Sequence, residues 1–131
     1  MPVVSITRDE IDIPAMIEAA KQPETGGIVT FVGIVRDDGI IGMELESYED
    51  KAIEDLNCIA SEAMSEFGLN HVEVVHRIGH LPVGDHIVAI VAGAAHRKAA
   101  FDGCEYVLDR IKESVPIWKK DIMEEGERWH H

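Results

Sequence analysis

Two stretches of the chain place apolar residues at the three- and four-residue spacing of an α-helix. The first is residues 50–67, and Gly68 follows where a left-handed residue would end the helix. The second is residues 96–114, which stops before Pro116 because the residue preceding a proline avoids helical geometry. The pattern predicts two long amphipathic helices. Their apolar stripes are Ile53, Leu56, Ala60, Ala63, Met64 and Phe67 in the first, and Ala100, Cys104, Val107, Leu108 and Ile111 in the second.

The other apolar residues occur in shorter runs, rich in β-branched and aromatic side chains, that are typical of strands. They predict strands over residues 3–8, 26–37, 40–49, 71–79 and 85–94, with a turn at 81–85. A short helix is expected over 12–21, with Asp12 as its N-cap and Pro14 in its first turn. Residues 117–131 show no clear period. This mixture predicts one α+β domain over residues 1–131, with helices flanking a mixed or antiparallel sheet.

Charge is distributed unevenly along the chain. The formal net charge is −13, which argues against nucleic acid or an anionic membrane as a general partner. Residues 97–128 nevertheless hold 7 of the 12 lysines and arginines. A local cationic site in an acidic protein favours a small anionic ligand, and chance clustering of surface lysines is the alternative.

No apolar run approaches the roughly 20 residues that a membrane span needs. The first ten residues lack the basic and apolar regions of a signal peptide. Cys58 and Cys104 are too few and too far apart for a disulfide framework or a zinc motif. We therefore expect a cytoplasmic protein.

His96 and Arg97 fall where a strand is expected to end and a helix to begin. The N-terminus of a helix carries partial positive charge, so cations are unfavourable there unless an anion binds between them. The pair therefore suggests a phosphate or carboxylate site. A solvated first turn, with the charges turned away, is an equally good interpretation.

Further cations follow the ends of predicted elements. Arg36 comes at the end of the strand "FVGIVR" and suits bidentate binding of phosphate. Lys112 lies in the last turn of a helix, where the helix dipole alone explains it. Lys119 and Lys120 follow Trp118, and a partly desolvated lysine loses its proton more readily. Solvated lysines are the commoner case.

The histidines do not predict a metal site. His76 and His80 would share a helix face, but Gly79 and Pro82 prevent a helix there. No glycine-rich phosphate loop is present. We expect neither a metal nor a cofactor. His130 and His131 are set aside, because histidines at a chain end are often added ones.

Three separated motifs carry a resemblance: "GGIVTFVGIVR", "HRIGHLPVGDHIVAIVAGAAHRKAAF" and "IKESVPIWKKD", followed by "EGERW". Together they resemble the large, catalytic subunit of molybdopterin synthase, the MoaE family, from Gly26 to Trp129. The resemblance implies an α/β-hammerhead type fold and a homodimer. It also implies a ubiquitin-like small subunit whose C-terminal Gly-Gly thiocarboxylate enters the pocket. The implied reaction places two sulfurs on cyclic pyranopterin monophosphate and gives the dithiolene of molybdopterin.

The resemblance also assigns the site residues. Catalysis falls to Lys112 and Lys119. Substrate binding falls to Ile34, Val35, Arg36, His96, Arg97, Lys112, Lys119, Lys120 and Asp121. Asp121 stands where relatives often have glutamate, and many relatives continue further past "EGERW".

Other interpretations remain open at the level of sequence. A dimeric module that only binds a small phosphate ligand would need Arg36, His96 and Arg97 but not both Lys112 and Lys119. An inactive scaffold for a ubiquitin-like tail is a third possibility. If the chain is the enzyme, its sulfur should come from the separate partner, and neither cysteine should be required.

Overall fold

The computed structural model describes residues 1–124 and 126–130 and contains two four-stranded sheets and three helices. The larger sheet has the order β1-β4-β6-β2. Strand β1 pairs with β4 in parallel, and the other two pairs are antiparallel. Its strands are β1 (Val3–Thr7), β2 (Gly27–Ile34), β4 (His71–Arg77) and β6 (His86–Ala94). The predicted α+β class with a mixed sheet is confirmed.

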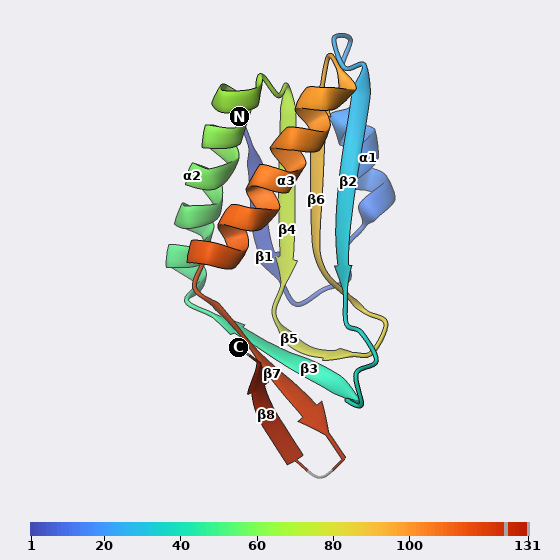
Figure 1. Cartoon of the computed structure of the whole chain (residues 1–131), viewed down its shortest axis with the longest axis vertical. Coiled ribbons are helices and arrows are strands. Elements are labelled where there is room, and N and C mark those ends of the chain that lie inside the picture. Colours follow the sequence, from blue (N-terminus) through green and yellow to red (C-terminus); the bar gives the residue numbers. More distant parts are fainter. Residues whose placement is uncertain (125, 131) are drawn as a thin grey trace.

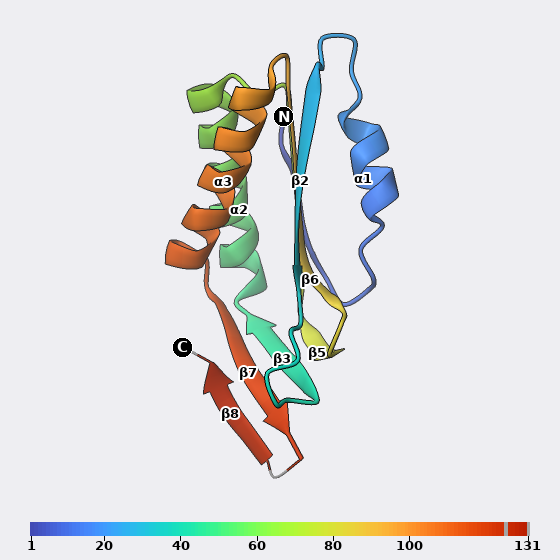
Figure 2. The ribbon, with the colours of Figure 1, turned by 45° about the vertical axis from the view of Figure 1, so that its right-hand side comes forward.

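Helices cover both faces of this sheet, α2 and α3 on one and α1 on the other (Figure 2). They are α1 (Ile13–Ala20), α2 (Glu49–Phe67) and α3 (Arg97–Ser114), close to the predicted ranges. Asp12 caps α1, because its Oδ1 accepts the N–H of Ala15 at 3.1 Å. Gly68 ends α2 at φ +67, as predicted.

Alternate residues of the central strands pack against different helices, as the two-residue period of a strand requires. In β6, Ile90 and Ala92 belong to the core beneath α2 and α3, whereas Ala89 and Val91 belong to the core beneath α1. Both faces of β6 are therefore apolar, which explains why the sequence shows a continuous apolar run there rather than an alternation.

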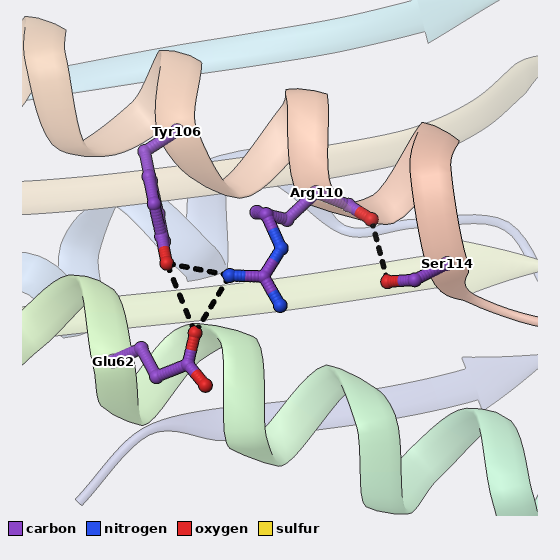
Figure 3. Close-up of polar contacts among 4 residues, drawn as sticks. All are labelled: Glu62, Tyr106, Arg110 and Ser114. Atoms are coloured by element: carbon purple, nitrogen blue, oxygen red, sulfur yellow. Dashed lines mark hydrogen bonds and ion pairs between the residues drawn. The ribbon is translucent and has the colours of Figure 1, made fainter.

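Close packing and polar contacts hold α2 and α3 together. At Gly103 of α3, a Cβ would approach Leu69, just after α2, to 2.6 Å, so only glycine fits without displacing it. In the second half of each helix, Glu62 of α2 accepts hydrogen bonds from Tyr106 of α3 at 2.9 Å and from Arg110 of α3 at 2.8 Å (Figure 3). Within α3 itself, the hydroxyl of Ser114 donates to the carbonyl oxygen of Arg110 at 3.0 Å.

The second sheet lies beyond the lower end of the first (Figure 1) and is fully antiparallel. Its order is β5-β3-β7-β8, formed by β3 (Gly42–Ser47), β5 (Gly79–Pro82), β7 (Ile117–Met123) and β8 (Gly126–His130). The aperiodic tail thus forms a hairpin that the sequence did not predict. Residues 79–82, expected as a strand end and a turn, form the separate strand β5.

Candidate active site

A pocket of about 410 Å³ lies where the two sheets meet below the end of β2. Apolar side chains from β2, β6 and α3 form part of its lining, and five charged side chains share it. The charged residues are Arg36, Asp38, Lys112, Lys119 and Asp121. They come from the loop after β2, the last turn of α3 and strand β7.

The loop after β2 is fixed by Val35, which is 1% exposed. Its N–H donates to the carbonyl oxygen of Asp85 at 2.9 Å, and its carbonyl oxygen accepts the N–H of Gly84 at 2.8 Å. The side chains on either side, Ile34 and Arg36, point away from the core and line the pocket. Val35 therefore contributes by anchoring the backbone, and Ile34 and Arg36 contribute their side chains.

The connection between α3 and β7 brings two lysines into the same pocket. Pro116 ends the helix, and the N–H of Ile117 donates to the carbonyl oxygen of Val115 at 2.8 Å. The chain therefore turns directly from the helix into the strand. As a result, Lys112 in the last turn of α3 lies near Lys119 in β7, close enough to influence its protonation.

Lys119 is partly buried, and burial lowers the pKa of its ammonium group below the usual value. The positive charge of Lys112 lowers that pKa further, and the carboxylate of Asp121 opposes the change. Asp121 lies on the same face of β7 as Lys119 and is 4% exposed. A lysine with a lowered pKa gives up its proton more readily, so it is a better proton donor than an ordinary surface lysine.

Lys120 lies between these two residues in β7 and points to the other face of the strand. Its Nζ forms an ion pair with Glu127 Oε1 of β8 at 3.3 Å, and it is absent from the pocket lining. The structure thus brings Ile34, Arg36, Lys112, Lys119 and Asp121 together around the pocket and leaves the Lys120 side chain outside it.

His96 and Arg97 lie at the start of α3, and Lys112 lies in its last turn, at the opposite end of the helix. Arg97 and Lys112 are fifteen positions apart along the helix, a rise of about 22 Å. Both side chains are exposed. Within one chain, this pair is therefore remote from the pocket that contains the lysines.

The turn that presents His96 and Arg97 packs tightly against the start of β2. A Cβ on Gly26 would overlap the carbonyl oxygen of Ala95, and one on Gly27 would touch the Cα of Arg97 at 3.4 Å. The two glycines allow the strand backbone to approach this turn closely, and so fix where His96 and Arg97 sit on the molecule.

Comparison with known proteins identifies the family. The model of the family described as MoaE protein matches residues 6–114. The chain is 38% identical over 131 residues to a molybdopterin synthase catalytic subunit of Vibrio cholerae, covering 96% of this chain and 87% of that protein. The chain belongs to the MoaE family. Members of this family include the catalytic subunits of molybdopterin synthase, so the chain is an enzyme subunit of molybdenum cofactor biosynthesis.

Solved structures agree with this MoaE assignment. Molybdopterin synthase from Staphylococcus aureus superimposes with a TM-score of 0.91 at 35% identity, covering 96% of this chain and 95% of that one. A complex of subunits 1 and 2 of molybdopterin-converting factor from Helicobacter pylori superimposes with a TM-score of 0.82 at 24% identity, covering 96% and 88%. At that lower identity the likeness concerns the fold.

The cysteines of this MoaE-family chain lie outside the cluster of lysines. Cys104 lies on the buried face of α3 and is 4% exposed. Burial raises the pKa of its thiol to about 11. It is therefore a protonated, buried thiol at neutral pH, as its position on the apolar stripe predicted. Cys58 is exposed on α2. Neither residue lines the pocket.

One buried histidine near the site was not predicted from the sequence, where its spacing bears only on a possible metal ligand. His76 of β4 is 4% exposed, and its Nδ1 lies 2.9 Å from the carbonyl oxygen of Arg77. Burial lowers its pKa to about 4, and the charge of Lys119 contributes to that shift. His76 is therefore neutral at pH 7. Among the described residues, no group of three or more His, Cys, Asp and Glu side chains could hold a metal ion.

Proposed function

We propose that this chain transfers two sulfur atoms to cyclic pyranopterin monophosphate, and that each sulfur is delivered by one C-terminal thiocarboxylate of a ubiquitin-like small subunit. The observation that supports this proposal is the convergence of Arg36, Lys112 and Lys119 on one pocket with apolar walls. The substrate phosphate and the thiocarboxylate are both anions. Three cations gathered at one pocket would stabilise the negative charge of both.

The same cations suit the chemistry of sulfur transfer. When the thiocarboxylate sulfur attacks a substrate carbon, a carbon–sulfur bond forms, the bond from that carbon to an oxygen breaks, and the small subunit is left joined to the substrate as a thioester. Water then cleaves the bond between the sulfur and the acyl carbon, which leaves the sulfur on the substrate and releases the small subunit as a carboxylate. Negative charge develops on the departing oxygen, and a nearby ammonium group both stabilises the charge and supplies the proton. Lys119 suits the role of donor because burial and Lys112 lower its pKa.

The remote pair His96 and Arg97 fits the proposal if the protein is a homodimer. Strand β2 is an edge strand of the larger sheet, and a groove of about 320 Å³ runs beside it along α3. Phe101 lines this groove and is 61% exposed, although it is large and apolar. We propose that two copies pair across this surface.

A two-fold axis near the middle of α3 would reverse the direction of the second helix. The start of one α3 would then lie near the end of the other. His96 and Arg97 of the partner subunit would thereby approach Lys112 and Lys119, and each pocket would contain cations from both chains.

The proposed partner and location follow from the resemblance. The Helicobacter pylori structure is a complex of subunits 1 and 2 of molybdopterin-converting factor. We propose that this chain binds an equivalent small subunit. A cytoplasmic location is part of the same proposal. No helix in the described part of the chain is long and apolar enough to cross a membrane.

The direct test is to incubate the protein with cyclic pyranopterin monophosphate and a thiocarboxylated small subunit, and to assay the dithiolene product. Product should form only when all three components are present. A variant with Cys58→Ser and Cys104→Ser should retain near wild-type activity, since the sulfur arrives on the partner. A folded double variant that binds the partner but transfers no sulfur would contradict this route.

A further inference from the structure

Arg36 and Asp38 form an ion pair at the edge of the pocket. Arg36 Nε lies 2.8 Å from Asp38 Oδ2, and both residues line the cavity. Both side chains are largely exposed, 82% for Arg36 and 55% for Asp38. The carboxylate therefore occupies one of the donor positions through which the guanidinium would bind a phosphate or a carboxylate.

The backbone keeps this carboxylate close to Arg36. The N–H of Asp38 donates to the carbonyl oxygen of Arg36 at 3.0 Å, which closes a tight turn. Gly39 follows with φ +78, a conformation that favours glycine, and the chain then enters the second sheet through the Ile41 N–H bond to Ile122. Asp38 is thus an anion attached two residues away from its cation, at high effective concentration.

We propose that Asp38 is a tethered competitor that pairs with Arg36 and must be displaced from it when an anionic substrate binds. This inference rests on the proposed function, because it concerns the substrate-binding role of Arg36. It assigns Asp38 as a residue that sets substrate affinity and does not take part in the chemical step.

The balance of charge around the pocket supports this role. The lining includes three cations, Arg36, Lys112 and Lys119, and two carboxylates, Asp38 and Asp121. Asp121 is buried and acts on Lys119. Asp38 is the exposed carboxylate and is therefore the one that can swing into solvent when another anion takes its place.

The expected effect is modest, because exposed ion pairs are weak. We call the form with the Arg36–Asp38 ion pair closed and the form without it open. An exposed ion pair favours the closed form over the open form by at most about five to one. A ligand that needs the open form then binds more weakly by the fraction of molecules that are open, which amounts to about a two- to six-fold loss of apparent affinity.

The neighbouring Asp37 offers a matched control. It is exposed, has the same charge, and forms no ion pair with the described residues. Asp38→Asn and Asp37→Asn each remove one negative charge from the same loop, and only Asp38→Asn removes the competitor. Each substitution is made both in the wild type and in Arg36→Ala. Binding of inorganic phosphate is followed by NMR titration, and KM and kcat are measured with cyclic pyranopterin monophosphate.

Asp38→Asn should lower the dissociation constant of inorganic phosphate, and KM, about two- to six-fold while kcat is unchanged. Asp37→Asn should change neither by a comparable factor. In the Arg36→Ala background, Asp38→Asn should change neither the dissociation constant of phosphate nor KM, because the guanidinium with which Asp38 pairs is then absent.

Equal effects of the two asparagine variants would overturn the proposal, because general electrostatics would explain them. Weaker binding in Asp38→Asn would also overturn it and would show that Asp38 orients Arg36. A wild type that makes no dithiolene would instead refute the proposed function, whereas the phosphate titration would still test Asp38.

Discussion

Lys119 differs from most of the lysines of this protein in its surroundings. It is partly buried, lies near a second lysine and shares its strand face with the buried Asp121. Burial and the charge of Lys112 both lower its pKa, whereas the exposed Lys51 has its pKa raised by its hydrogen bond to Asp55. The local environment, and not the residue type, therefore makes Lys119 the better proton donor.

Lys119→Ala should lower kcat by at least about 100-fold, as expected when a group that donates a proton in the transition state is removed. The measurement is the rate of dithiolene formation at saturating substrate. Lys51→Ala is the control, because it removes an exposed lysine of α2. Normal turnover by a folded Lys119→Ala variant would remove Lys119 from the catalytic group.

His76 makes stability depend on pH. Its pKa is lowered to about 4 in the folded chain, whereas an unfolded chain binds a proton near pH 6.5. Below that pH the unfolded state binds more protons, so the free energy of unfolding falls as the pH decreases from 6.5 towards 4. The contribution amounts to at most about 3 kcal/mol.

His76→Gln should make the free energy of unfolding less dependent on pH between 7 and 4, whatever its effect on stability at pH 7. Urea unfolding at a series of pH values measures this. His80→Gln is the control, since the His80 side chain is 58% exposed. If His76→Gln and the wild type lose stability in parallel, another group is responsible for the dependence.

At the scale of the elements, the start of β2 and the turn before α3 depend on each other. Because Gly26 has no side chain, the carbonyl group of Ala95 can pack closely against its Cα. The N–H of Gly26 also donates to the carbonyl oxygen of Ala94 at 2.9 Å. This contact places the first turn of α3, and with it His96 and Arg97, against the edge of the larger sheet.

Gly26→Ala should destabilise the protein by about 1–3 kcal/mol, because the new methyl group meets backbone that cannot move aside. Gly27→Ala is the matched control: its Cβ meets its nearest atom at 3.4 Å, and loss of unfolded-state freedom offsets the contact. Thermal unfolding measures both. Equal stability of the two variants would show that the turn at 95–97 yields to the added methyl group.

At the scale of the whole molecule, the site as predicted from sequence cannot form within one chain. Arg36, Lys112 and Lys119 share a pocket, whereas His96 and Arg97 lie at the far end of α3. The proposed two-fold pairing along β2 and α3 resolves this separation, because it brings the two ends of α3 from different chains together.

Complementation between two inactive variants tests the pairing. Arg97→Ala and Lys119→Ala homodimers should each be impaired. A mixed dimer has one pocket with both substitutions and one with neither, so a refolded equimolar mixture should recover about a quarter of wild-type activity. Recovery should fail if each site is built from one chain, and sedimentation as a monomer at micromolar concentration would exclude the pairing.

The sequence by itself determined the helices and the identity of the cations. The apolar stripes of α2 and α3, the cap at Asp12 and the stops at Gly68 and Pro116 depend on residues within a few positions of one another, so they are visible in a local window. The motifs around Arg36, Arg97 and Lys119 likewise sufficed to suggest the family, which the comparisons then confirmed.

Only the tertiary structure decided how the strands divide between two sheets and which cations meet. Sheet pairing joins residues far apart in the chain, as when Lys119 pairs with Leu45 and with His130. The face that each side chain of β7 presents depends on that pairing, so no local pattern separates Lys119, in the pocket, from Lys120, beside Glu127. The separation of Arg97 from Lys112 follows from the predicted length of α3, whereas the tertiary structure decided that the Lys112 end of the helix, and not the Arg97 end, lies at the pocket.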